Sequence, residues 1–139
     1  MITNALRGKK LPIYGDGLYA RDWLHVEDHC RALDLVLRQG KAGQVYNIGG
    51  DNEWENLKTA KLVLKYLGKP EALIAHVTDR LGHDRRYALD FSKLTRELGW
   101  RPKIKFEDGL LRTVDWYVQN QKWLERIRSI VGASKISID

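Results

Sequence analysis

The sequence has 139 residues, the length of one ordinary domain, and is 43% hydrophobic and 30% charged. Five Trp, six Tyr and only three Pro exclude a disordered or collagen-like chain. No apolar run is long enough for a transmembrane helix, and the first residues lack the pattern of a signal peptide. The single cysteine, Cys30, can form neither an internal disulfide nor a zinc site alone, and it indicates a reducing, cytoplasmic setting.

The chain is basic, with 24 Lys and Arg against 18 Asp and Glu, a net charge of +6. This excess favours an anionic partner, such as a nucleic acid, a nucleotide or a phosphorylated metabolite. A basic surface that only confers solubility accounts for the same charge equally well.

The hydrophobic pattern predicts short strands that alternate with helices. The expected strands lie at 11–14, 23–26, 44–48, 72–77 and 87–89. The expected helices lie at 1–6, 28–39, 52–67, 90–98, 106–120 and 123–130, and residues 132–139 are expected to form a frayed tail. This alternation is typical of an α/β fold, but the strands are too few for a complete doubly wound nucleotide fold. We therefore expect part of a larger protein.

The predicted helix at 28–39 is apolar around more than one face, through Leu33, Leu35, Val36 and Leu37. Such a helix is typically buried on two sides. We expect the chain alone to expose apolar surface there and to associate through it.

The predicted loop from Asp79 to Arg86 holds three Arg and one His within eight residues. An Arg side chain presents a planar fork of donors that matches phosphate oxygens, and Gly82 would let the backbone turn close to a ligand. The alternative is a solvated charge cluster in which Asp79 and Asp84 pair with the arginines. The residue types alone favour this alternative.

Weaker candidates lie outside this loop. Arg21 follows a Gly-rich turn beside Trp23, and Asn56 lies on a predicted helix, yet each alone is better explained as structural. Gly49–Gly50 follows a predicted strand but fits neither G-x-G-x-x-G nor the Walker pattern. His25 and His29 are four residues apart without the remaining ligands of a metal site.

Five motifs in order are together highly specific. They are LPIYG at 11–15, RDWLHVEDH at 21–29, YNIGG at 46–50, DRLGHDRRY at 79–87, and ELGW at 97–100 followed by Pro102. Their order and spacing resemble the C-terminal part of dTDP-glucose 4,6-dehydratases, which are extended short-chain dehydrogenases/reductases. The resemblance runs from Met1 to about Trp123. Leu81 departs from it, because the family usually has Pro there.

The resemblance implies an α/β, C-terminal substrate-binding region over residues 1–131, without the N-terminal Rossmann domain that binds NAD. Enzymes of this kind oxidise the sugar at C4, eliminate water across C5 and C6, and return the hydride to C6. Their Gly-rich NAD loop, Tyr-x-x-x-Lys pair and acidic dehydration residues lie upstream of the matched region. We therefore expect this chain alone to hold no NAD, no metal and no catalytic residue, and to be inactive. The implied substrate is a dTDP-sugar, bound by a full-length homodimer that needs neither nucleic acid nor membrane.

The same resemblance assigns substrate contacts by position. Pro12, Ile13 and Tyr14 would line the nucleotide base, and Arg21, Asn56 and Arg80 would face the diphosphate. The remaining contacts would be Asp79, Leu81, Gly82 and His83. The role of the arginines agrees with their independent interpretation as phosphate ligands, and the joint pattern reverses the preference for a solvated cluster. Two alternatives stay open, namely a non-catalytic basic module for RNA or a nucleotide sugar, and a related dehydratase or epimerase that uses another nucleotide.

Overall fold

The computed structural model describes the backbone of residues 1–133 and the side chains of residues 1–130. The helices are α1 (Ile2–Leu6), α2 (Val26–Gln39), α3 (Asn56–Tyr66), α4 (Ser92–Leu98), α5 (Phe106–Gln119) and α6 (Gln121–Ala133), with a 3₁₀ turn at Glu71–Leu73. The strands are β1 (Leu11–Tyr14), β2 (Ala20–Asp22), β3 (Glu53–Glu55) and β4 (Ile74–Val77).

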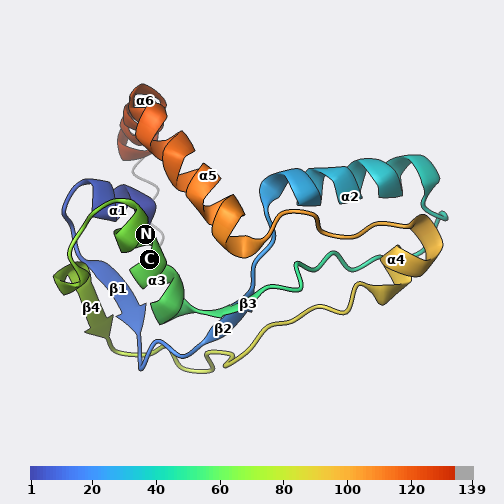
Figure 1. Cartoon of the computed structure of the whole chain (residues 1–139), viewed down its shortest axis with the longest axis horizontal. Coiled ribbons are helices and arrows are strands. Elements are labelled where there is room, and N and C mark those ends of the chain that lie inside the picture. Colours follow the sequence, from blue (N-terminus) through green and yellow to red (C-terminus); the bar gives the residue numbers. More distant parts are fainter. Residues whose placement is uncertain (134–139) are drawn as a thin grey trace.

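The elements gather at two ends of an elongated molecule (Figure 1). α1, α3, β1 and β4 lie at one end, and α2 and α4 lie at the other. Extended segments run between the two ends, and α5 rises from the middle toward α6. No helix within residues 1–133 combines the length and apolar character needed to cross a membrane.

The strands form two small sheets rather than one. β1 pairs in parallel with β4, from Leu11 opposite Ile74 to Tyr14 opposite Val77. β2 pairs antiparallel with β3, and Ala20 of β2 also bridges Arg86. This bridge places the loop from Asp79 to Arg86, the basic loop, beside β2. Residues about sixty positions apart in sequence thereby become neighbours.

One core cluster lies beneath β1. The strand alternates, with Leu11 and Ile13 buried and Pro12 and Tyr14 exposed, as expected for one face on a core. The buried residues of this cluster are Ala5, Leu11, Ile13, Ala60, Val63 and Leu64. The positions 60, 63 and 64 share one face of α3, so helical spacing and strand alternation meet in a single core.

A second cluster joins α2 to α4 and consists of Ala32, Leu94 and Trp100. Beside it lies the fully buried carboxylate of Asp28. Its Oδ2 accepts hydrogen bonds from the N–H groups of Lys103 at 2.8 Å and Ile104 at 2.9 Å, and its Oδ1 binds Arg31. Asp28 thus attaches α2 to the segment that precedes α5.

The structure confirms most predicted elements but corrects several boundaries, including the strand expected at 72–77, which begins at Ile74 after a 3₁₀ turn. The predicted strand at 23–26 is wrong, because the strand is β2, and α2 begins at Val26 after His25 caps it by accepting the N–H of Glu27 at 3.3 Å. The helix expected from Asn52 begins at Asn56, because residues 53–55 pair with β2.

Two predicted strands, at 44–48 and 87–89, carry no regular secondary structure. A strand needs a paired neighbour, and an apolar run by itself does not supply one. Within residues 1–133 neither run joins a sheet. Of the predicted tail, Gly132 and Ala133 belong to α6, and the rest lies outside the described residues.

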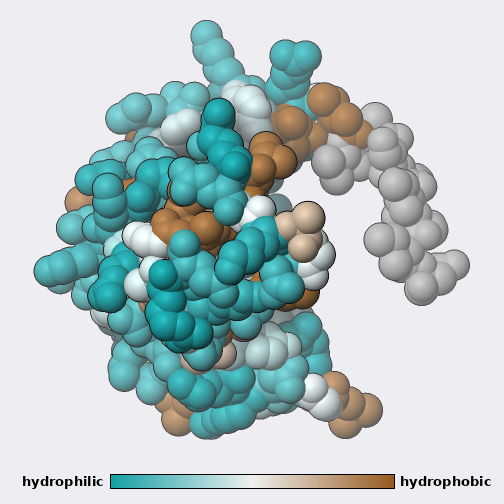
Figure 2. All heavy atoms as spheres, turned by 90° about the vertical axis from the view of Figure 1, so that its right-hand side faces the viewer, coloured by the Kyte–Doolittle hydropathy of each residue, from teal (hydrophilic) through white to brown (hydrophobic). Residues whose placement is uncertain are grey.

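The outer face of α2 carries exposed apolar side chains, as its sequence predicts. Ala32 is buried, whereas Val26, Leu33 and Leu37 are exposed, Leu37 to 86%. Seen from the α2 and α4 end, the surface is mostly hydrophilic with separate hydrophobic patches (Figure 2).

Candidate functional site

A pocket of about 230 Å³ forms where β1, β2, the start of α3 and the basic loop meet. Its lining residues are Met1, Pro12, Ile13, Tyr14, Arg21, Asn56, Arg80 and His83. Seven of these eight are among the ten positions that the sequence predicts as substrate contacts. Segments that are far apart in the chain therefore supply one site.

The start of α3 places Asn56 in the pocket wall. The N–H of Asn56 donates to the carbonyl of Tyr19 at 2.9 Å, and the N–H of Leu57 donates to that of Gly17 at 3.0 Å. The first two N–H groups of the helix are therefore already used. An anion here would be held by side chains, including the Asn56 amide, more than by the end of the helix.

A hydrogen-bonded chain of four side chains begins in the pocket wall, at Arg21 and His83, and continues to Asp79 and Tyr19. Arg21 Nη2 is 2.9 Å from His83 Nε2, and His83 Nδ1 is 2.7 Å from Asp79 Oδ1. Tyr19 donates its hydroxyl proton to Asp79 Oδ2. The His83 side chain is only 4% exposed, and its ring stacks on Tyr19 with centroids 4.0 Å apart.

The guanidinium groups of Arg21 and Arg80 are not paired with carboxylates. Arg21 donates to the carbonyl of Ala20 at 2.7 Å and to His83, and Arg80 lies over the Tyr14 ring at 5.1 Å. Neither guanidinium makes an ion pair with a carboxylate within the described part of the chain. Two unneutralised cations thus line one small pocket.

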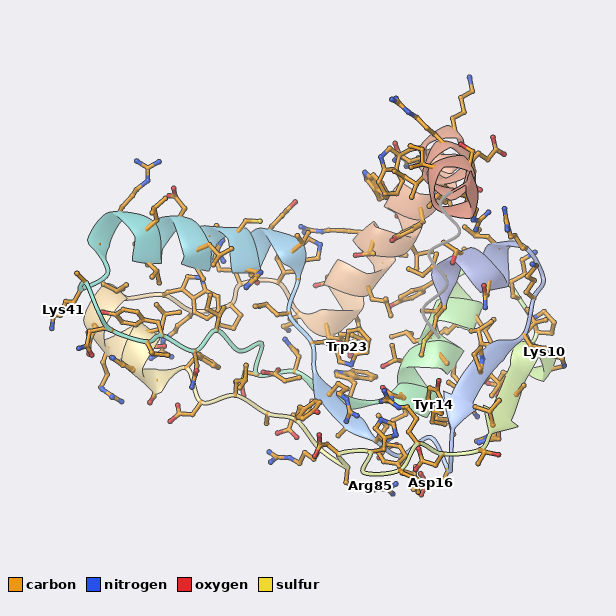
Figure 3. All side chains as sticks on the ribbon, turned by 180° about the vertical axis from the view of Figure 1, so that it is seen from behind. Lys10, Tyr14, Asp16, Trp23, Lys41 and Arg85 are labelled. Carbon is orange, nitrogen blue, oxygen red and sulfur yellow. The ribbon has the colours of Figure 1, made fainter. Side chains whose placement is uncertain are left out.

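The other two arginines of the loop are paired with carboxylates from outside it. Arg85 donates to both oxygens of Asp16, at 2.8 and 2.9 Å, and the two lie together at one edge of the molecule (Figure 3). Arg86 donates to both oxygens of Glu53, each at 2.6 Å. These hydrogen bonds lower the pKa of Asp16 to about 2 and hold that of Glu53 below its ordinary value. Arg85 and Arg86 are thus paired, but with Asp16 and Glu53 and not with Asp79 and Asp84, as the solvated-cluster alternative expects.

Three predicted contacts lie outside the pocket wall. Asp79 lies behind His83, Leu81 is fully exposed, and Gly82 makes a turn with φ of +68°. Sequence reasoning missed Tyr19, which is nearly buried and bonds to Asp79 across sixty positions of sequence. No local pattern around Tyr19 indicates this partner.

The Gly49–Gly50 turn packs closely against Asp22 and Trp23. The N–H of Gly50 donates to Asp22 Oδ2 at 2.8 Å, and a Cβ on Gly50 would lie 2.0 Å from the carbonyl oxygen of Trp23. The turn leads into β3 and not into a helix. It therefore does not fit the pyrophosphate of NAD.

A larger hollow of about 560 Å³ lies between α2 and the segment after α4, where Arg31 and Trp100 are among its lining residues. Arg31 is already paired with Asp28. None of the predicted contacts lies there, so the smaller pocket is the better candidate for a ligand. No group of three or more His, Cys, Asp or Glu in residues 1–133 is placed to hold a metal ion.

Comparison with known proteins identifies the family of the chain. The GDP-mannose 4,6 dehydratase family matches residues 1–113. The chain belongs to this family. The dTDP-glucose 4,6-dehydratase of Salmonella typhimurium is 51% identical over an alignment of 136 residues, and this alignment covers 93% of this chain and 38% of that protein. The resemblance inferred from the five motifs is confirmed.

Solved structures show the same relationship. The dTDP-glucose 4,6-dehydratase of Bacillus anthracis, solved with NAD, is 55% identical with a TM-score of 0.81, over 88% of this chain and 39% of that one. A UDP-glucose 4-epimerase of Thermotoga maritima, solved with UDP-glucose, is 32% identical with a TM-score of 0.80, over 86% of this chain and 38% of that one. The α/β fold class is confirmed, and the chain spans about two fifths of the relatives it matches.

Proposed function

We propose that the pocket binds the nucleoside diphosphate portion of a dTDP-sugar, as part of an NAD-dependent dTDP-glucose 4,6-dehydratase. The observation that carries this proposal is the pair of carboxylate-free guanidinium groups, Arg21 and Arg80, in one pocket wall. A diphosphate presents several anionic oxygens in a small volume, and Arg forks bind such oxygens through charge-assisted hydrogen bonds. The Asn56 amide adds a neutral donor beside them.

The exposed end of β1 suits the nucleoside. Tyr14 is 41% exposed at the end of the strand, and Pro12 and Ile13 line the same wall. An aromatic ring with a guanidinium 5.1 Å from its centroid offers a planar, polarised surface to a base. In this assignment the pocket selects the base through its shape, through stacking on the Tyr14 ring and through backbone groups.

The complete enzyme would convert dTDP-glucose to dTDP-4-keto-6-deoxyglucose. NAD, held by the Rossmann part of such an enzyme, would supply the hydride acceptor and donor. The residues of this chain would bind and orient the substrate at its diphosphate, remote from the reacting carbon atoms. We propose accordingly that the chain alone is inactive, and that the full-length enzyme is a cytoplasmic homodimer.

Two observations favour this proposal over its alternatives. Identity to dehydratases, at 51% and 55%, exceeds the 32% identity to the epimerase. Two free arginines in a pocket of about 230 Å³ suit one diphosphate better than the many phosphates of a nucleic acid strand. A single-stranded RNA would need a longer basic groove with several stacking platforms.

Calorimetric titration distinguishes these ligands. The chain should bind dTDP-glucose saturably at one site, more tightly than UDP-glucose and with a shallow dependence on salt. Binding of a single-stranded RNA oligonucleotide with a steep linear log–log salt dependence, and none of dTDP-glucose, would contradict the proposal. Incubation with dTDP-glucose and NAD should give no 4-keto product, whereas clear turnover would refute the predicted inactivity.

A further inference from the structure

We propose that Asp79 is a positioning residue that orients both arginines of the pocket, although it does not line the pocket itself. This inference rests on the proposed function, because it concerns how the diphosphate site is prepared. Asp79 Oδ1 accepts the backbone N–H of Arg80 at 2.9 Å, which fixes the start of that residue, and the Nδ1–H of His83 at 2.7 Å. His83 in turn contacts the guanidinium of Arg21.

The hydrogen-bond donors fix the tautomer of His83. A guanidinium can only donate, so the Nε2 atom of His83, 2.9 Å from Arg21 Nη2, must be the acceptor. The ring proton then lies on Nδ1, where the carboxylate of Asp79 receives it. Asp79 therefore selects the one neutral form of His83 that can hold Arg21.

Packing holds this chain of contacts in place. The imidazole of His83 stacks on Tyr19 at an interplanar angle of 16° and meets Tyr14 edge-on at 5.8 Å. Tyr19 donates to the second oxygen of Asp79. The carboxylate is thus fixed from both sides, and a rotation of its plane would break contacts to two aromatic rings at once.

The arrangement also decides what a ligand meets in the pocket. Asp79 binds neutral donors and leaves both guanidinium groups without a carboxylate. The one acceptor that His83 could offer, Nε2, is already used by Arg21. The side-chain groups of Arg21, Arg80 and Asn56 then present donors to an incoming anion, which favours a fully ionised diphosphate.

The test combines thymidine diphosphate binding with the nitrogen NMR signals of His83. Asp79→Asn should release the fixed tautomer and weaken binding about tenfold, the effect of one charge-assisted contact. His83→Gln should retain part of the affinity, because its amide oxygen can still accept from Arg21, whereas His83→Phe keeps the stacking and loses the acceptor. Asp34→Asn, on the exposed face of α2, is the control for the same loss of charge and should bind normally.

A double-mutant cycle gives the decisive result. If Asp79 acts through Arg21, the loss in Asp79→Asn/Arg21→Ala should be smaller than the sum of the single losses. Additive losses, or wild-type affinity in Asp79→Asn, would overturn the inference. A proton found on Nε2 of wild-type His83 would overturn it without reference to any ligand. Absence of thymidine diphosphate binding to the wild-type chain would instead refute the proposed function, and the inference with it.

Discussion

The Nε2 atom of His83 accepts a hydrogen bond from Arg21, 62 positions earlier in the sequence, across 2.9 Å. This contact joins the basic loop to β2 and forms one wall of the pocket. Arg21 and His83 are therefore parts of one site, and a change at either should alter the position of the other.

Removal of the Asp28 carboxylate should destabilise the fold. Asp28→Ala leaves the N–H groups of Lys103 and Ile104 without their acceptor and frees the Arg31 guanidinium. The loss of these partly buried hydrogen bonds and of the ion pair should lower the free energy of unfolding by about 2–4 kcal/mol in total. Urea unfolding should show this loss, and Asp34→Ala, on an exposed part of the same helix, should change the free energy by less than about 0.5 kcal/mol.

The contribution of Asp28 should depend on pH. Burial raises the pKa of its carboxyl, but hydrogen bonds from Arg31 and from the N–H groups of Ile104 and Lys103 outweigh burial, so the pKa lies below its ordinary value of 3.8. A lowered folded-state pKa contributes stability that is complete above that ordinary value and is lost as pH falls below it. The stability difference between wild type and Asp28→Asn should therefore shrink below about pH 4. A difference that grows with acidification would contradict this assignment.

The sequence predicts the helices better than the strands, for physical reasons. The helices expected at 90–98 and 106–120 rest on local signals, namely apolar spacing and Gly99 at the end of α4, and both helices are confirmed. β2 and β3 are three residues each and depend on partners about thirty positions away. Residues 44–48 show the opposite error, because their apolar composition indicates a strand that finds no partner in the described chain.

The candidate pocket contains many of the residues that the sequence points to. The resemblance carried by the five motifs names seven of the eight residues that line the pocket, which no single residue type could have done. The resemblance does not show that Arg85 is paired with a carboxylate and that Arg80 is not, because the partner of Arg85, Asp16, lies 69 positions away. The support from Tyr19 was missed for the same reason, since a contact to Asp79 leaves no local trace in the sequence.

A methyl group on Gly50 should disrupt the turn that precedes β3. The added Cβ would lie 2.0 Å from the backbone oxygen of Trp23, which cannot rotate away. Gly50→Ala should lower the free energy of unfolding by about 1–3 kcal/mol. Gly68 has open space around it and only an unfavourable φ of +60°. The Gly68→Ala variant should therefore lose less free energy of unfolding than Gly50→Ala, and its melting temperature should fall less. Equal losses in the two variants would show that the turn can relax.

The outer face of α2 should drive association of the isolated chain. Leu33 and Leu37 are 50% and 86% exposed on successive turns of the helix. Leu33→Lys/Leu37→Lys should shift sedimentation toward the monomer and reduce the fluorescence of an apolar dye. Asp34→Lys, which changes net charge by the same amount on the same helix, should leave both readings close to wild type. A wild-type chain that is already a clean monomer without dye binding would contradict this expectation.

The binding of dTDP-glucose to variants of the free and the paired arginines tests most directly whether Arg21 and Arg80 hold the diphosphate. Arg21→Ala and Arg80→Ala should each weaken the binding of dTDP-glucose about tenfold to a hundredfold, because a charge-assisted hydrogen bond contributes roughly 1.5–3 kcal/mol. Lysine at either position should restore only part of the affinity. Arg86→Ala, which removes a guanidinium paired with Glu53, should leave the dissociation constant near wild type. Unchanged affinity in Arg21→Ala and Arg80→Ala, with a lowered melting temperature, would show that the two arginines are structural and do not bind the diphosphate.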